Sequence, residues 1–297
     1  MPSLLDSVAA IIAAELKPHY AYKTMIAQPR RLIKITITAV FFGLAGCQSP
    51  ASKFDQHART TGLERQTEDG LVLYRKRKLV DGEAIHIYLD GDGTPSLRHG
   101  QISLDPTSRD RLILKLIGVD PTSSVLVGRP CYYGSGEDSC RAELWTTQRY
   151  SKDVVDRLVD AINTVIQRYP KSQISLIGYS GGGALAMLAA PGLDRVDVLI
   201  TIAANLDTRA WVEYHGYAPL EGSLNPADQT PLPARIRQFH FFGEVDENVP
   251  ARLSRRVLAR QPNAQTQVIS GFTHACCWAE IWVRRLSEIN RLLAAGS

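Results

Sequence analysis

One serine stands inside a glycine cluster directly after an apolar run. Residues 174–184 read Ile-Ser-Leu-Ile-Gly-Tyr-Ser-Gly-Gly-Gly-Ala, and Ser180 is the central residue of a G-x-S-x-G pattern at 178–182. The apolar run predicts a strand, and the segment 184–190 predicts a helix. A serine raised on a strained turn between them needs neighbours without a Cβ, because strand and helix pack closely there. The pattern therefore predicts a nucleophile elbow.

A phosphate-binding loop is the main alternative for such a glycine cluster, and an incidental strand–helix turn is the other. No G-K-[ST] follows the glycines, which excludes a Walker loop. The remaining question is whether the chain supplies a base and an orienting acid for the serine.

Two residues downstream have the types that this chemistry requires. Asp246 follows the strand-like stretch 238–243, and His274 follows another at 266–269. A histidine can take the proton of a serine hydroxyl, and a carboxylate can hold the imidazole in the correct tautomer. Asp207, shortly after the strand-like run 196–202, is the rival orienting acid.

The order Ser180, Asp246, His274 is the order in which α/β hydrolases place their triad. At these residues, within a match from about Leu71 to the C-terminus, the chain resembles the α/β-hydrolase superfamily. The resemblance implies a serine nucleophile, a histidine base, an orienting aspartate and no cofactor. It also implies that the residue after the nucleophile, Gly181, supplies one backbone N–H to an oxyanion hole.

The second oxyanion donor is expected in the turn after an early strand at residues 84–89. This turn reads Asp90-Gly91-Asp92-Gly93, where related enzymes usually carry a His-Gly sequence. The resemblance assigns the donor to the backbone of Asp92, with Gly91 as the near alternative. A calcium loop competes for these residues, but the following Thr-Pro breaks the EF-hand spacing.

Apolar strand runs alternate with helical patterns along the rest of the chain. This alternation predicts an α/β fold, with a mostly parallel sheet covered by helices on both faces. The amphipathic spacing of residues 151–169 predicts one of these helices. The expected strands are 71–78, 84–89, 124–128, 174–177, 196–202, 238–243 and 266–269, and the expected helices are 108–117, 151–169, 184–190, 251–259 and 278–293.

The composition fits a globular protein: 44% of the 297 residues are hydrophobic, and the net charge is +4. Most of that excess lies in residues 1–46, which leaves a net charge of +1 for the remainder. Because basic and acidic residues are nearly equal in number there, the charge gives no support to a nucleic-acid partner.

The N-terminal region has the pattern of an export signal. Basic residues at 30–34 precede an apolar run at 35–46 that is too short to span a bilayer but suits a signal sequence. Leu-Ala-Gly-Cys at 44–47 resembles the lipobox of bacterial lipoproteins, in which Cys47 is acylated. An ordinary secretory signal and a twin-arginine signal are the alternatives, and Met25 would give a start of normal length.

These features predict three parts: an extension and signal at 1–46, a polar tether at 47–70 and a hydrolase domain at 71–297. Gln48, rather than an aspartate, follows the lipidated position. This favours the outer membrane of the cell envelope, with the membrane as a partner through the anchor.

Export implies an oxidising compartment, in which the other four cysteines could form disulfides. Cys131 and Cys140 could close a short disulfide loop. Adjacent Cys276 and Cys277 could form a vicinal bridge, bind a partner or stay as small buried hydrophobes, of which the last is favoured. No metal-type His/Cys spacing occurs.

The predicted function is an envelope serine hydrolase that cleaves ester-like acyl bonds of a small substrate. A silent hydrolase fold acting as a binding lipoprotein, and an acyltransferase or peptidase on the same triad, are the alternatives. Prolines interrupt the segment 205–235, where lipases carry a lid helix, so an open site for short or polar acyl groups is expected.

Overall fold

A computed structural model describes residues 48–76 and 78–295. The predicted signal region, residues 1–46, and the predicted lipidation site, Cys47, lie outside the described residues. Within the described residues, no helix combines the length and the apolar character needed to cross a bilayer.

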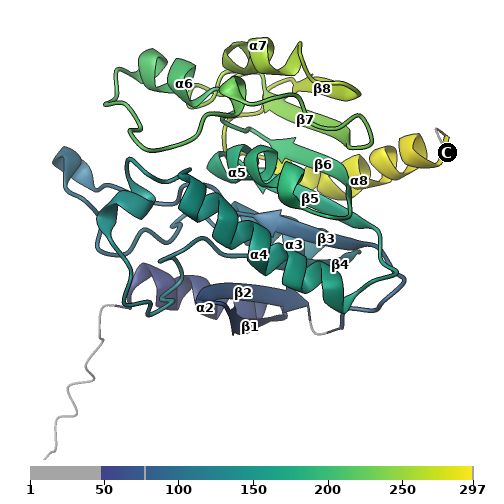
Figure 1. Cartoon of the computed structure of the whole chain (residues 1–297), viewed down its shortest axis with the longest axis horizontal. Helices are drawn as coiled ribbons and strands as arrows, with labels where there is room; N and C mark the ends of the chain where they lie inside the picture. The colour runs from purple at the N-terminus through teal and green to yellow at the C-terminus, as the bar shows by residue number, and fades with distance from the viewer. Residues whose placement is uncertain (1–47, 77, 296–297) are drawn as a thin grey trace, which may run out of the picture. The chain divides into compact units, whose positions relative to one another are not determined.

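Eight strands form one sheet in the order β1-β2-β4-β3-β5-β6-β7-β8 (Figure 1). Strand β2 runs antiparallel to both of its neighbours, and every other pairing is parallel. The strands are β1 (Leu63–Glu68), β2 (Leu71–Lys76), β3 (Ile85–Leu89), β4 (Ser123–Val127), β5 (Ile174–Tyr179), β6 (Val196–Ile202), β7 (Arg237–Gly243) and β8 (Ala264–Ile269). The predicted mostly parallel α/β architecture is confirmed.

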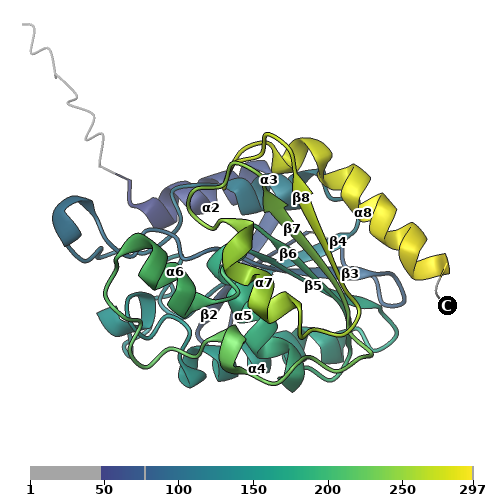
Figure 2. The ribbon, with the colours of Figure 1, turned by 90° about the horizontal axis from the view of Figure 1, so that it is seen from above.

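Helices cover both faces of this sheet, with α3 and α8 on one side and α4 and α5 on the other (Figure 2). The α-helices are α2 (Pro50–Thr60), α3 (Leu112–Val119), α4 (Lys152–Arg168), α5 (Gly181–Ala189), α6 (Thr208–His215), α7 (Arg255–Leu258) and α8 (Trp278–Ala295). The 3₁₀ turns are η1 (Arg98–Gly100), η2 (Ala142–Trp145), η3 (Ala190–Gly192), η4 (Pro226–Asp228) and η5 (Ala251–Ser254).

The central strands and helices owe their positions to burial. Every residue of β3 is buried, as expected for a strand covered on both faces. Ser151 caps the amino end of helix α4 by accepting a hydrogen bond on its Oγ from the N–H of Val154, and the apolar residues of the helix recur on one face. Helix α5 consists of glycine, alanine and other apolar residues and is buried throughout, because its small side chains let it lie close to the sheet.

The predicted tether at 47–70 is wrong from residue 50 onward. Helix α2 and strand β1 belong to the folded domain, and the side chains of Phe54 and Ala58 are fully buried. The ring of Phe54 lies 4.5 Å from that of Tyr133 and 5.5 Å from that of Tyr74. A narrow face of three buried residues, which includes Ala51, docks this otherwise polar helix.

Two predicted helices differ from the structure. The helix expected at 108–117 begins only at Leu112, where the carboxylate of Asp110 accepts a hydrogen bond from the Leu112 N–H. The helix expected at 251–259 is split into the 3₁₀ turn η5 and the four-residue α7. In the lipase-lid region, α6 has eight residues, in accord with the proline content.

A buried hydrogen-bond network joins the amino end of the sheet to α8. The carboxylate of Asp120 lies 2.6 Å from Nδ1 of His86 and accepts a hydrogen bond from the hydroxyl of Tyr88 at 2.5 Å. That hydroxyl accepts one in turn from the indole N–H of Trp282 at 2.8 Å. Burial disfavours the charged carboxylate, but hydrogen bonds from His86 and Tyr88 hold the pKa of Asp120 below its usual range.

We expect Asp120→Ala to lower the free energy of unfolding by about 2–4 kcal/mol, because it leaves buried partners unsatisfied. A depressed carboxyl pKa stabilises the fold above the unfolded pKa and loses that effect as pH falls. The difference from wild type should therefore shrink below about pH 4. Urea unfolding at neutral and acidic pH measures it, with exposed Asp197→Ala as the matched control. Equal stability of the two variants at neutral pH would contradict the role of the network.

Candidate active site

The carboxyl ends of four parallel strands bring the candidate residues together. Ser180 follows β5, Asp246 follows β7, His274 follows β8, and the turn at 90–93 follows β3. Parallel strands place their carboxyl ends on one edge of the sheet, so loops distant in sequence meet there.

Ser180 has the strained backbone that an elbow requires. Its φ and ψ are 53° and −122°, outside the regions that a side chain with a Cβ prefers. The elbow tolerates no Cβ at two of its glycines. A Cβ on Gly178 would collide with the backbone of residues 182–183, and one on Gly182 would collide with the carbonyls of Leu89 and Asp90.

His274 lies between the serine and the acid. Its Nε2 is 3.0 Å from Oγ of Ser180, and its Nδ1 is 2.9 Å from Oδ2 of Asp246. An ionised carboxylate only accepts hydrogen bonds, so beside it Nδ1 carries the proton and Nε2 is free to accept from the serine hydroxyl. The histidine side chain is 19% exposed, which leaves it accessible from the pocket.

Asp246 is buried and oriented by its own loop. Its Oδ1 accepts hydrogen bonds from the N–H groups of Asn248 at 2.9 Å and Val249 at 2.8 Å, which leaves Oδ2 for the histidine. The rival acid Asp207 lies elsewhere: its carboxylate caps α6 through the N–H of Ala210. The geometry therefore favours Asp246 over Asp207 as the partner of the histidine.

The turn at 90–93 packs directly against the elbow. The N–H of Gly91 is already bonded to the Asp90 carboxyl at 2.8 Å. Among the described residues, no hydrogen bond occupies the N–H of Asp92 or that of Gly181. The N–H groups of Asp92 and Gly181 are therefore free to bond a ligand, whereas that of Gly91 is not, which favours Asp92 over Gly91 as the candidate donor.

The side chain of Asp92 is held by three groups that the sequence prediction missed. Its Oδ1 accepts from Arg129 at 2.6 Å, and its Oδ2 accepts from Arg149 at 3.1 Å and from the hydroxyl of Tyr150 at 2.6 Å. Burial would raise the pKa of Asp92, but the two arginines and Tyr150 lower it to about 2. Two guanidinium groups on this carboxylate also argue against the calcium alternative.

Neighbouring Asp90 has a different environment. It is 2% exposed, and burial raises its pKa to about 7, although Gly91 and the hydroxyl of Tyr133 both donate to it. Its role in the structure is to shape the turn. The position where related enzymes carry histidine is thus a buried turn residue here.

A pocket of about 640 Å³ opens over Ser180 and His274. Its lining combines apolar residues with polar ones, and includes Ile102, Arg149 and Trp211. Asn205 also lines it, and neither polar atom of its side-chain amide has a hydrogen-bond partner within the described residues. Sequence reasoning did not assign Arg129 or Asn205 to the site. The signal that could have found them is that each lies shortly after the carboxyl end of a buried strand.

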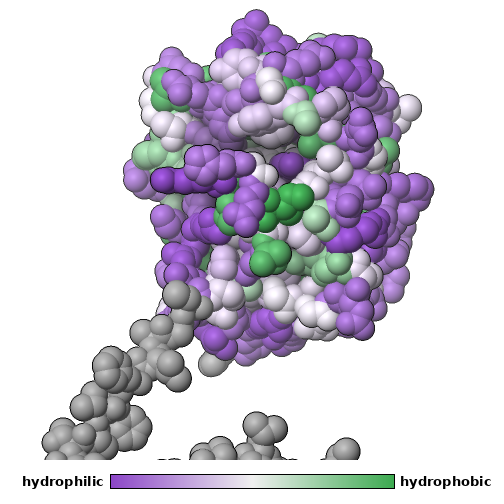
Figure 3. Space-filling view, turned by 90° about the vertical axis from the view of Figure 1, so that its left-hand side faces the viewer, coloured by the Kyte–Doolittle hydropathy of each residue, from purple (hydrophilic) through white to green (hydrophobic). Residues whose placement is uncertain are grey.

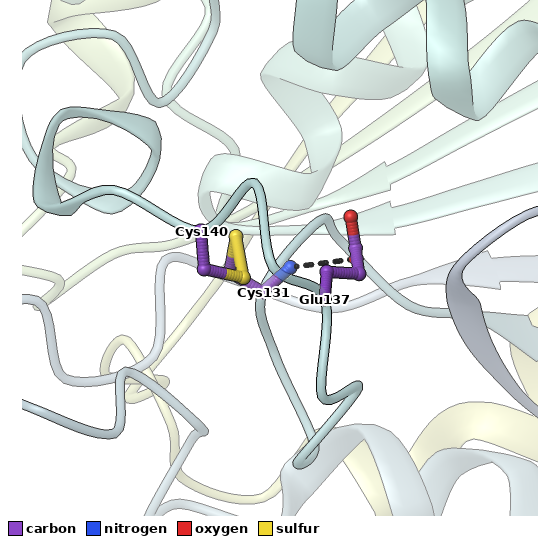
Figure 4. Close-up of side chains that lie close together, drawn as sticks. All are labelled: Cys131, Glu137 and Cys140. Atoms are coloured by element: carbon purple, nitrogen blue, oxygen red, sulfur yellow. Dashed lines mark hydrogen bonds between the residues drawn. A yellow bond between two sulfur atoms is a disulfide. The ribbon is translucent and has the colours of Figure 1, made fainter.

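Cys131 and Cys140 are joined in a disulfide in the loop after β4, with Cα atoms 5.5 Å apart (Figure 4). Glu137 lies beside the bridge, accepts a hydrogen bond from the Cys131 N–H at 3.2 Å and pairs with Arg157 of α4. Thiolates are the form that binds metal, so the bridged sulfurs do not make this trio a metal site.

Cys276 and Cys277 are also paired, which corrects the preferred interpretation of two buried thiols. Cys276 is exposed, and the pair lies two residues beyond His274, just before α8. The carbonyl of His274 accepts from the indole N–H of Trp278 at 3.0 Å, which fixes this loop on the helix.

Comparisons with known proteins agree with this architecture. The family model described as "Serine hydrolase (FSH1)" matches residues 129–275, a range that contains Ser180, Asp246 and His274. No sequence among the curated proteins matches the chain.

Solved structures share the fold at low identity. A candidate lipase from Acinetobacter baumannii superposes with a TM-score of 0.56 and 11% identity, covering 84% of this chain and 98% of its own. A candidate α/β hydrolase from Agrobacterium tumefaciens superposes with a TM-score of 0.52 and 13% identity, covering 78% of this chain and 97% of its own. Est1E from Butyrivibrio proteoclasticus superposes with a TM-score of 0.50 and 16% identity, covering 79% of this chain and 99% of its own. The shared structures show the α/β-hydrolase fold, and the match at residues 129–275 supports a serine hydrolase.

Proposed function

We propose that this protein hydrolyses carboxylic ester-like acyl bonds through an acyl-enzyme on Ser180. The observation that supports this most directly is the continuous hydrogen-bonded series from Ser180 through His274 to Asp246. The strained elbow presents the serine hydroxyl to the pocket at the point where the histidine can take its proton.

In the first half of the reaction, Oγ of Ser180 attacks the carbonyl carbon while Nε2 of His274 accepts its proton. Asp246 stabilises the imidazolium that forms. The N–H groups of Gly181 and Asp92 would hold the oxyanion, because they lack other partners. His274 then gives its proton to the leaving alcohol, and a water molecule releases the acid in the second half.

The arginine pair on Asp92 has a positioning role in this proposal. Arg129 is 1% exposed and also donates to the carbonyl of Gly91, so it ties the turn through both backbone and side chain. A fixed turn keeps its N–H at the oxyanion position without reorganisation during the reaction.

The pocket favours short or polar acyl groups. Trp211 and Tyr217 form part of its wall, but Arg149, Asn205 and several hydroxyl-bearing residues share it. No long lid helix follows β6, since α6 ends at His215.

We expect kcat/KM to fall as the acyl chain grows beyond about four to six carbons, because each further methylene gains little in such a pocket. A series of p-nitrophenyl esters from acetate to palmitate measures this. A value that rises steadily to the long-chain esters would contradict the short-acyl proposal.

The triad chemistry also fits a peptidase or an acyltransferase, and the fold could serve a silent binding lipoprotein. Matched esters, thioesters and amides of one acyl group distinguish these functions, with and without an acceptor alcohol. Preferred turnover of the ester to free acid supports the hydrolase. Turnover of none of them, with correctly folded protein, would support the binding role.

The envelope location remains a proposal that rests on the sequence pattern at 30–47. A multiply acylated cysteine anchors stably, because each buried CH₂ contributes about 0.8 kcal/mol. We expect Cys47→Ser to move the protein out of the membrane fraction and to change its gel mobility. Unchanged fractionation and mobility would place the anchor elsewhere.

A further inference from the structure

Exposed hydrophobic side chains are concentrated around the mouth of the pocket. Within the described residues, five of the nine large exposed hydrophobics lie in the connections that follow the carboxyl ends of strands, in loops or, for Tyr214, in helix α6. They are Ile102, Leu104, Tyr214, Tyr217 and Val245. The space-filling view of this side shows hydrophobic side chains gathered near the middle of a mostly hydrophilic face (Figure 3). Such a patch beside a pocket indicates an interaction surface.

The most exposed of these residues lie on a segment at 95–105 that we name the rim hairpin. Its strands meet at a bridge between Ser96 and Ile102. Ser103 is buried, and its carbonyl accepts a hydrogen bond from the indole N–H of Trp145 at 3.1 Å. Successive side chains of an extended segment point to opposite faces, so both neighbours of buried Ser103 point outward. Ile102 is 47% exposed and Leu104 97%.

The N-terminal chain enters the domain beside this hairpin. The N–H of Ala51 donates to Oδ2 of Asp105 at 2.9 Å, and Asp105 is the residue next to Leu104. Cys47 lies four residues before Ala51, so even a fully extended chain places them within about 14 Å. A lipid on Cys47 would therefore hold the rim hairpin close to the bilayer surface.

The charges of the hairpin suit an anionic surface. Arg98 is exposed and has no hydrogen-bond or ion-pair partner among the described residues. The carboxylate of Asp105, the acidic residue of the hairpin, is already occupied by the N–H groups of Ala51 and Thr107. A cation beside two exposed aliphatic side chains is the combination that binds the interface of an anionic bilayer.

We propose that the rim hairpin docks on an anionic lipid bilayer, with Ile102 and Leu104 in the interface and Arg98 among the headgroups. Gly100 and Ile102 also line the pocket, so docking turns its mouth toward the headgroup layer. This orientation rests on the lipid anchor proposed above and not on the hydrolytic activity. The apolar N-terminal segment is the competing occupant of the same surface.

Site-specific fluorescence tests the orientation. Leu104→Cys and, as the matched control, Val283→Cys on α8 each introduce one free thiol, because the other cysteines of the domain are paired. Val283 is also exposed, at 44%. The lipidated proteins, labelled with an environment-sensitive fluorophore, are reconstituted into phosphatidylethanolamine–phosphatidylglycerol vesicles that contain a headgroup nitroxide quencher.

We expect strong quenching of the label at position 104 and little at 283, since the anchor holds both proteins on the vesicle. Equal quenching at the two positions, or none at 104, would overturn the docking. A label at 104 that is already shielded before lipid is added, in the unprocessed chain with Cys47→Ser, would also overturn it, because the N-terminal segment would then cover the hairpin.

A second measurement uses the full chain with Cys47→Ser. We expect Leu104→Asp to weaken its vesicle binding about tenfold, the effect of losing one buried leucine, and Val283→Asp to leave it unchanged. Equal binding of both would overturn the proposal. Mass analysis of Cys47 tests the anchor, and hydrolysis of a soluble ester tests the activity. Failure of either is therefore distinguishable from failure of the docking.

Discussion

Ser180→Ala should lower kcat by about 10⁴–10⁶ while the fold survives, because the residues of a triad act as a unit and the nucleophile has no substitute. The elbow backbone accepts alanine as it accepts serine, and within the described part of the chain the Ser180 hydroxyl is hydrogen-bonded only to His274. Initial rates with a short-chain ester measure the loss.

Thermal unfolding serves as the control for Ser180→Ala, since its melting temperature should match that of wild type. Retention of more than about one per cent of kcat would contradict the nucleophile assignment, given the size of triad effects. A second control, Ser270→Ala, removes a serine hydroxyl from the same edge of the sheet, where it bonds to Glu244. It should leave kcat near wild type.

Asp246→Asn should reduce kcat by about 10⁴, because an amide at this position favours the wrong histidine tautomer. Asp207→Asn is the matched comparison, since asparagine caps a helix about as well as aspartate and Asp207 makes no contact with His274. Rates of the two variants on one ester decide between them. Loss of activity only in Asp207→Asn would show that the orienting acid had been misassigned.

The central fold could be predicted from the sequence because burial leaves a clear pattern there. Strands β3 to β7 are largely buried and rich in apolar residues, and α4 shows a helical repeat with a serine cap. The elbow could be predicted because its glycines are required by backbone contacts that no Cβ tolerates.

The N-terminal part of the domain could not be predicted in this way. Helix α2 attaches through the ring of Phe54 to Tyr74 on β2 and Tyr133 on the loop after β4, contacts that the local sequence does not show. Its polar composition resembles that of a tether. The start of α3 was also misplaced: the carboxylate of Asp110, inside the expected helix 108–117, accepts the hydrogen bond of the Leu112 N–H at the point where the helix begins.

The residues around Asp92 were missed because their partnership is entirely tertiary. Arg129 follows β4, and Arg149 and Tyr150 precede α4, while the carboxylate that they bind follows β3. No spacing in the sequence links these positions. By contrast, Ser180, Asp246 and His274 could be found because each follows a recognisable strand and the three occur in a characteristic order.

Covalent labelling by a fluorophosphonate tests the central claim most directly, because the probe reacts with an activated serine and forms a stable adduct. Mass mapping of the labelled protein should place one adduct on Ser180. Ser180→Ala should remain unlabelled, and Asp246→Asn should be labelled far more slowly than wild type. Equal labelling of wild type and Ser180→Ala, or an adduct mapped to another serine, would contradict the assignment of Ser180 as the nucleophile.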